Sequence, residues 1–180
     1  MDAAPDGAIR TLFSAKAIAD RIDRLAGDIA ASGLADLTVV AVLKGSFIFA
    51  ADLIRALHRE GLKPEIDFIY LASYDGERIS RGEVRVVRDI GSDVRGRNVV
   101  IVDDIFDSGR TLHFAKLLLL RAGAARVLTC VLVDKQVPRA AAIVPDFVGF
   151  SCPPVFVVGY GMDFHNRYRE LPFIGELVAG

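Results

Sequence analysis

The sequence is poor in the residues that build disulfide frameworks and Cys/His metal sites. It has two cysteines and three histidines among 180 residues. Cys130 and Cys152 lie in apolar stretches and form no Cys-x-x-Cys pair, so we expect buried free thiols in a reducing cytoplasm. His58, His113 and His165 lack the spacing of metal ligands, which argues against a zinc site.

The sequence also lacks a stretch that could cross a membrane as a helix. A spanning helix takes ~20 mostly apolar residues, whereas the longest uncharged run, residues 147–162, is interrupted by Pro153, Pro154 and several glycines. We interpret this run as broken strands of a core. Residues 1–6 show neither the basic nor the apolar region of a secretory signal, so we expect no signal peptide and a cytoplasmic location.

Neither sign of charge dominates the chain. Its 22 Lys and Arg residues face 23 Asp and Glu residues, which gives a net charge of −1. A general electrostatic attraction to nucleic acid or to an anionic membrane is therefore not expected. The balance leaves room for a small, local basic site.

The chain is rich in apolar segments that alternate with helical patterns. Hydrophobic residues make up 52% of it, enough for a sizeable core in one domain spanning residues 1–180. Ile18, Ile22, Leu25 and Ile29 recur at helical spacing, and Gly33 is a suitable helix stop. Two more helices are expected, one capped by Ser46 and ending near residue 61, the other over residues 110–122. Strands are expected over residues 38–43, 65–72, 84–88, 98–102, 126–133, 147–150 and 155–158.

Apolar strands alternating with helices predict an α/β fold with a central, mainly parallel sheet flanked by helices. In such folds ligands bind at the carboxyl ends of the strands. The chemistry should therefore lie in the polar turns after Leu43, Val102 and Val133.

The most informative segment is VVIVDDIFDSGRT, residues 99–111. Small residues and free N–H groups at a helix start, with the hydroxyls of Ser108 and Thr111, suit a phosphate monoester. The carboxylates of Asp103 and Asp104 just upstream suit a sugar diol or Mg²⁺. The competing interpretation is a helix cap with a solvated acidic surface, which the apolar strand in front of the segment disfavours.

Other phosphate-binding motifs do not fit. The sequence has no Gly-x-x-x-x-Gly-Lys, and Gly159-x-Gly161 is followed by Phe164 where a dinucleotide fingerprint has its third glycine. A phospho-receiver domain also uses an acidic pair, but after its first strand, whereas two strand–helix units precede Asp103 here.

Several further segments fit one family. They are Leu43-Lys44-Gly45-Ser46, Ser73-Tyr74, Val133-Asp134-Lys135, Pro145-Asp146-Phe147-Val148-Gly149-Phe150 and Phe156-Val157-Val158-Gly159-Tyr160-Gly161-Met162-Asp163. Together with residues 103–111 they resemble the type I phosphoribosyltransferases, and within that family the bacterial hypoxanthine (hypoxanthine-guanine) enzymes. The similarity runs from about residue 13 to residue 177, nearly the whole chain.

The resemblance implies a fold, a reaction and a cofactor. The fold has a small hood from the N- and C-terminal segments and a flexible lid loop of about residues 73–83, led by Ser73 and Tyr74. The reaction moves a phosphoribosyl group from Mg²⁺-bound phosphoribosyl pyrophosphate to N9 of a 6-oxopurine, with hypoxanthine the leading substrate. It also implies a homodimer or homotetramer and a cis peptide bond between Leu43 and Lys44.

The resemblance further implies a role for each matching residue. Asp107 is the general base near purine N7. The 5′-phosphate is held by Ser108, Gly109, Arg110 and Thr111. Asp103 and Asp104 face the ribose hydroxyls and Mg²⁺, and Asp163 stands at the purine side and helps to hold a second Mg²⁺. Lys135 donates to O6, Phe156 stacks on the base, and the carbonyl of Val157 faces position 2. Pyrophosphate is bound by Lys44, Gly45 and Arg169.

Two departures and two alternatives accompany this hypothesis. Relatives more often have Glu where Asp103 stands, and the lid sequence is more charged than is usual in the family. A non-catalytic, nucleotide-sensing regulator on the same fold is expected to lose Asp107 or Lys135, yet both are present. An orotate or pyrimidine phosphoribosyltransferase is disfavoured by Lys135, Phe156 and Asp163.

Overall fold

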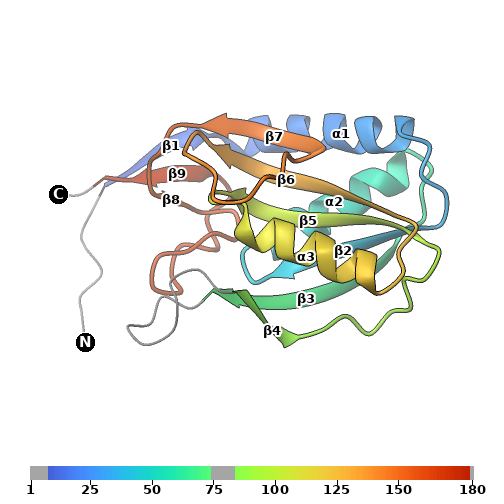
Figure 1. The fold of residues 1–180 in the computed structure, drawn as a ribbon. Coiled ribbons are helices and arrows are strands. Elements are labelled where there is room, and N and C mark those ends of the chain that lie inside the picture. The colour runs from blue at the N-terminus through green and yellow to red at the C-terminus, as the bar shows by residue number, and fades with distance from the viewer. Residues whose placement is uncertain (1–7, 74–83, 179–180) are drawn as a thin grey trace.

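A six-stranded sheet forms the centre of the molecule (Figure 1). The computed structural model describes residues 8–73 and 84–178. The strand order is β4-β3-β2-β5-β6-β7, with bounds Val84–Arg88, Glu65–Ser73, Leu37–Leu43, Asn98–Phe106, Arg126–Lys135 and Phe147–Cys152. All neighbours are parallel except β3 and β4, which pair antiparallel. The predicted α/β fold with a mainly parallel sheet is confirmed.

Three helices cover the two faces of this sheet. α1 (Ala15–Ala31) and α2 (Phe47–Arg59) pack on one face, and α3 (Arg110–Arg121) packs on the other (Figure 1). The predicted apolar stripe of α1 is buried, including Ile18, Leu25 and Ile29. The chain leaves α1 and α3 at Gly33 and Gly123, which both adopt a positive φ that favours glycine.

A second, three-stranded antiparallel sheet joins the two ends of the described chain. Its order is β1-β9-β8, with bounds Ile9–Phe13, Ile174–Leu177 and Val157–Val158. The sequence does not predict β1 or β9. This small sheet lies where the hood is expected, beside the carboxyl ends of the large sheet (Figure 1). Of the expected lid, the structure describes only Ser73, which ends β3. Tyr74 and the rest of residues 74–83 lie outside the described residues.

Three local predictions need correction. β5 and β6 do not end at Val102 and Val133, because their mutual ladder continues to the pair Phe106–Asp134 after the β2–β5 ladder has ended at Val102. The acidic pair therefore lies within a strand. Ser46 precedes α2 but does not cap it with its side chain, because its hydroxyl donates to the carbonyl of Val42 at 2.6 Å. The strand expected over 155–158 shrinks to two residues, since the segment before it turns at Pro153 and Pro154.

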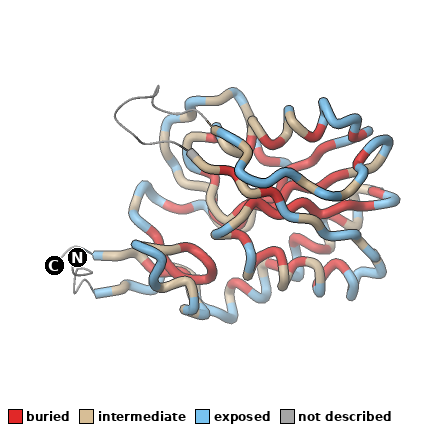
Figure 2. Tube along the Cα trace, turned by 90° about the horizontal axis from the view of Figure 1, so that it is seen from below, coloured by how far each residue is buried: buried red, intermediate tan, exposed pale blue. Residues whose placement is uncertain are grey.

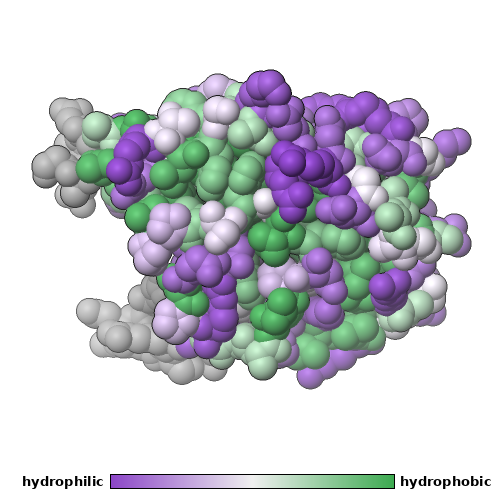
Figure 3. Space-filling view, turned by 90° about the horizontal axis from the view of Figure 1, so that it is seen from above, coloured by the Kyte–Doolittle hydropathy of each residue, from purple (hydrophilic) through white to green (hydrophobic). Residues whose placement is uncertain are grey.

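Buried residues follow the central strands and the inner sides of the helices (Figure 2). Cys130 and Cys152 are buried free thiols, as expected. Seen from above, hydrophilic and hydrophobic side chains are interspersed over the surface (Figure 3). Within residues 8–73 and 84–178, no helix is both long and apolar enough to cross a membrane.

Candidate active site

The acidic pair lies where the central sheet meets the turn into α3. Asp103 and Asp104 are adjacent on β5, their buried carboxyl groups lie close enough to interact, and the backbone N–H of Asp104 donates to the Asp103 carboxylate at 3.1 Å. Asp103 lines a hollow of about 60 Å³ together with the 107–109 turn. Asp104 faces Gly45, where an added Cβ would lie 1.8 Å from Oδ2 of Asp104. The two carboxyl groups therefore border two neighbouring features, the hollow at the 107–109 turn and the backbone at Gly45.

Both carboxyl groups resist ionisation in the protein alone. Burial, reinforced by the charge of Asp104, raises the pKa of Asp103 well above its usual range. Burial also raises the pKa of Asp104, although hydrogen bonds and the charge of Arg169 act in the opposite direction. A bound cation would offset this penalty, because it favours the charged form of each carboxylate.

The turn after β5 forms a small cradle at the start of α3. Gly109 takes a left-handed φ of 79° immediately before the helix, and the backbone N–H of Arg110 lies 3.5 Å from the hydroxyl of Ser108. Ser108, Gly109 and Thr111 line the same hollow as Asp103. The first turn of a helix has N–H groups without partners inside the helix, which suits an anion. The structure thus brings together the residues predicted to bind phosphate.

A second group gathers across β5 and β6. The ammonium of Lys135 lies 3.7 Å from the carboxylate of Asp107 and 5.9 Å from the centre of the Phe156 ring. The Asp107 side chain is 56% exposed and that of Lys135 is 14% exposed. Phe156 is 49% exposed and meets Phe164 edge-on. A cation, a carboxylate and an open aromatic ring around one space can hold a planar polar heterocycle.

A third group surrounds the turn between β2 and α2. The Leu43–Lys44 peptide bond is cis. Gly45 packs against Asp104 and also against Gly161. A Cβ added to Gly161 would lie 2.1 Å from the carbonyl oxygen of Gly45. Arg169 forms an ion pair of 2.6 Å with Asp163, and it donates to the carbonyl of Gly161. The lysine, the arginine and the backbone amides here can bind an anion with more than one phosphate.

Carboxylates in this site fit Mg²⁺ bound through a substrate better than Mg²⁺ held by protein alone. Among the described residues, no three His, Cys, Asp or Glu side chains cluster closely enough to hold a metal. Asp103, Asp104 and Asp163 are therefore not brought into one cage. Mg²⁺ commonly takes one or two carboxylates and completes its shell with water and substrate phosphates. The carboxylate oxygens of this site lie beside the anion-binding groups, so they suit Mg²⁺ that arrives with a phosphate-bearing substrate.

Arg139 is a site residue that the sequence does not single out. Its guanidinium donates to the carbonyls of Phe106, at 3.2 Å, and of Asp107, and it pairs with Asp134. It also lies 4.2 Å over the Phe106 ring. A lone arginine in a loop after Pro138 gives no periodic or motif signal, so only the fold shows that it holds the turn bearing Asp107.

Comparison with known proteins gives a consistent result. The model of the phosphoribosyl transferase domain family matches residues 9–165. The chain is 36% identical over 168 residues to the hypoxanthine-guanine phosphoribosyltransferase of Dictyostelium discoideum, covering 92% of this chain and 93% of that protein. It is 39% identical over 143 residues to the hypoxanthine phosphoribosyltransferase of Escherichia coli K12, covering 79% of each.

Solved structures agree with these relatives. A crystal structure of a hypoxanthine-guanine phosphoribosyltransferase from Bacillus anthracis, with HEPES in its active site, superposes with a TM-score of 0.88 at 39% identity. The match covers 95% of this chain and 100% of that one.

Proposed function

We infer that this chain, which belongs to the type I phosphoribosyltransferase family, is a hypoxanthine/guanine phosphoribosyltransferase of purine salvage. It transfers the 5-phosphoribosyl group of phosphoribosyl pyrophosphate to N9 of hypoxanthine or guanine, giving IMP or GMP and pyrophosphate. The observation that carries this inference is the meeting of a phosphate cradle, an acidic pair and a Lys135–Phe156 base site at one end of one sheet.

The purine side needs a proton acceptor and a donor to the 6-oxo group. We assign these roles to Asp107 and Lys135, whose charged groups lie 3.7 Å apart. As the N9–C1′ bond forms and the bond from C1′ to pyrophosphate breaks, Asp107 accepts the proton that the purine loses at N7. Lys135 donates to O6, which adenine lacks, and the exposed face of Phe156 stacks on the base. The carbonyl of Val157 faces position 2.

The phosphoribosyl side needs groups that hold anions and stabilise the departing pyrophosphate. Ser108, Gly109, Arg110 and Thr111 bind the 5′-phosphate, while Lys44, Gly45 and Arg169 bind the pyrophosphate. Mg²⁺, when bound with the substrate, neutralises charge on the leaving group. Asp104 lies beside Gly45 and Asp163 beside Arg169, so these two carboxylates are placed to hold the cation–pyrophosphate unit. Asp103 faces the ribose side.

The proposal extends to the setting of the enzyme. We place it in the cytoplasm as a homodimer or homotetramer, with phosphoribosyl pyrophosphate and a 6-oxopurine as its partners.

The direct test measures nucleotide formation from phosphoribosyl pyrophosphate and Mg²⁺ with hypoxanthine, guanine, xanthine and adenine in parallel. Turnover of 6-oxopurines without turnover of adenine supports the proposal. Binding of the pyrophosphate donor without turnover of any base would instead indicate a regulator. Asp107→Asn is expected to lower kcat by roughly 10²–10⁴-fold, the usual contribution of a general base. Nearly full turnover of that variant would remove Asp107 from the mechanism.

A further inference from the structure

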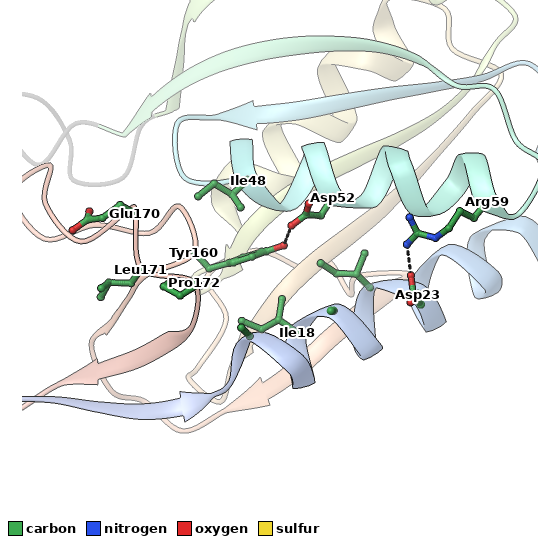
Figure 4. A pocket seen from close by; sticks show the side chains of 12 residues that line it. Ile18, Asp23, Ile48, Asp52, Arg59, Tyr160, Glu170, Leu171 and Pro172 are labelled. Atoms are coloured by element: carbon green, nitrogen blue, oxygen red, sulfur yellow. Dashed lines mark hydrogen bonds and ion pairs between the residues drawn. The ribbon is translucent and has the colours of Figure 1, made fainter.

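A buried tyrosine ties the loop after β8 to α2. The hydroxyl of Tyr160 donates to the carboxylate of Asp52 on α2. The bond crosses a cavity of about 450 Å³ that lies between α1, α2 and residues 170–172 (Figure 4). Tyr160 is 7% exposed. Burial, followed by the hydrogen bond to Asp52, raises the pKa of Tyr160, so the phenol remains a protonated donor.

The backbone of Tyr160 adopts a conformation that most residues avoid. Its φ is 51°, and it stands between Gly159 at 95° and Gly161 at 99°. A left-handed φ is unfavourable for a residue with a Cβ and persists when the surroundings determine it. Here the backbone N–H of Tyr160 donates to the carbonyl of Leu171 at 2.9 Å while the side chain is held by Asp52. The tyrosine is thus fixed at both ends.

The two elements joined by this bond carry the two halves of the pyrophosphate site. α2 begins directly after Lys44, Gly45 and Ser46. The loop after β8 continues to Gly161, whose N–H donates to the carbonyl of Arg169 at 3.0 Å and whose Cα packs against the Gly45 carbonyl. Any movement of this loop relative to α2 therefore changes the spacing between Lys44–Gly45 and the Asp163–Arg169 pair.

The purine side is held mainly by other contacts, although Phe164, directly after the 159–163 loop, meets the Phe156 ring edge-on. Phe156 and Val157 precede the loop and are held by β9, through the pair Val157–Glu176 and a 3.0 Å hydrogen bond from Leu177 N–H to the Phe156 carbonyl. Lys135 belongs to β6 of the large sheet. Loss of the Tyr160–Asp52 bond should therefore affect one substrate more than the other.

We propose that Tyr160 and Asp52 are positioning residues that set the spacing of the pyrophosphate site through their hydrogen bond. This inference rests on the proposed function of the site. We assign neither residue a direct contact with substrate. The bond holds the 159–163 loop against α2, so that Lys44, Gly45 and Arg169 meet the same pyrophosphate.

The test compares Tyr160→Phe and Asp52→Asn with a matched control, Asp23→Asn. Asp23 forms an ion pair with Arg59 on the wall of the same cavity, away from the 159–163 loop (Figure 4). We expect both test variants to raise KM for phosphoribosyl pyrophosphate by about tenfold and KM for hypoxanthine by less than about twofold, as a misplaced binding group would. Calorimetric titration with pyrophosphate and Mg²⁺ should show the same weakening of Kd without any turnover. Asp23→Asn should change neither constant.

The double variant distinguishes loss of this hydrogen bond from independent effects of the two substitutions and from a general loss of stability. If the hydrogen bond carries the coupling, Tyr160→Phe with Asp52→Asn should weaken pyrophosphate binding no more than either change alone. Additive losses, equal losses for both substrates, or a lower Tm with unchanged Kd would each overturn the proposal. Asp52 also forms an ion pair with Arg55, so, should Tyr160→Phe fail to fold, Asp52→Asn compared with Arg55→Met, which removes that ion pair alone, decides the question. Absence of turnover in the unaltered protein would contradict the proposed function instead, and the calorimetric comparison would still report on the bond.

Discussion

Replacing Arg139 by methionine removes the guanidinium that donates hydrogen bonds to the carbonyls of Phe106 and Asp107. Methionine keeps much of the side-chain volume but supplies no donor. A hydrogen bond to a charged group contributes about 1.5–3 kcal/mol when buried. The Arg139 side chain is 25% exposed, so we expect a total loss of about 2–3 kcal/mol in the free energy of unfolding, or about 4–12 °C in Tm for a chain of this size.

The same substitution should affect catalysis more than substrate binding. With its carbonyl released, Asp107 can shift, and a misplacement of about 1 Å can cost roughly 100-fold in rate. We therefore expect kcat to fall roughly 10–100-fold. KM for phosphoribosyl pyrophosphate should change little, because the carbonyl of Ser108 is still held by the N–H of Ala140 at 2.9 Å.

Thermal unfolding and initial rates at saturating substrates measure both effects. Arg95→Met is the matched control, since Arg95 pairs with Asp93 at an exposed site away from the active site, where water screens the interaction and little stability is lost. A kcat for Arg139→Met equal to that of Arg95→Met would refute the reasoning, whatever its Tm.

Three further substitutions test other parts of the site and fold. Lys135→Met should lower kcat/KM for hypoxanthine by about 10–100-fold through loss of a charged donor, with KM for phosphoribosyl pyrophosphate unchanged; equal losses for both substrates would contradict its role. Gly45→Ala places a methyl group on the Asp104 carboxylate, so calorimetry should show much weaker binding of pyrophosphate with Mg²⁺, and an unchanged Kd would be inconsistent with this packing. Burial pushes the pKa of Asp67 up, but N–H donors, including those of Phe68 and Ser92, lower it overall. Its charged form therefore stabilises the fold above about pH 4. Asp67→Asn should lower the free energy of unfolding at neutral pH, with a difference that shrinks in urea titrations as the pH falls below about 4; a constant difference would argue against the linkage.

The sequence predicts the centre of the large sheet well because β2, β5 and β6 are buried on both faces. In the sequence, β2, β5 and β6 contain continuous apolar runs, the pattern typical of central parallel strands. The ends of β5 and β6 escape this signal, since Asp103 and Asp134 are polar and are kept in the sheet by pairing with neighbouring strands. β1 and β9 also escape it, because they are short and pair across most of the length of the chain.

The candidate site follows the same division. Residues 103–111 form one continuous motif, so the sequence alone indicates their chemistry. Tyr160 and Arg139 instead act through contacts with residues that are distant in the sequence. Tyr160 bonds to Asp52 on α2, and Arg139 bonds to the turn after β5. Such contacts depend on how α2 and the loops pack, which local pattern does not encode.

The order of strands in the small sheet has a consequence for how the molecule is assembled during synthesis. β9 is the central strand of that sheet, yet it is the last strand among the described residues, so β1 and β8 both lack their partner until residues 174–177 have been made. All strands of the large sheet lie before residue 153 and have their partners earlier. Because pairings between distant segments carry the larger loop-closure cost and form late, we expect the small sheet to form after the large one. β8, which follows Phe156, and with it the segment proposed to contact the base, can therefore be completed only after residues 174–177 have been made.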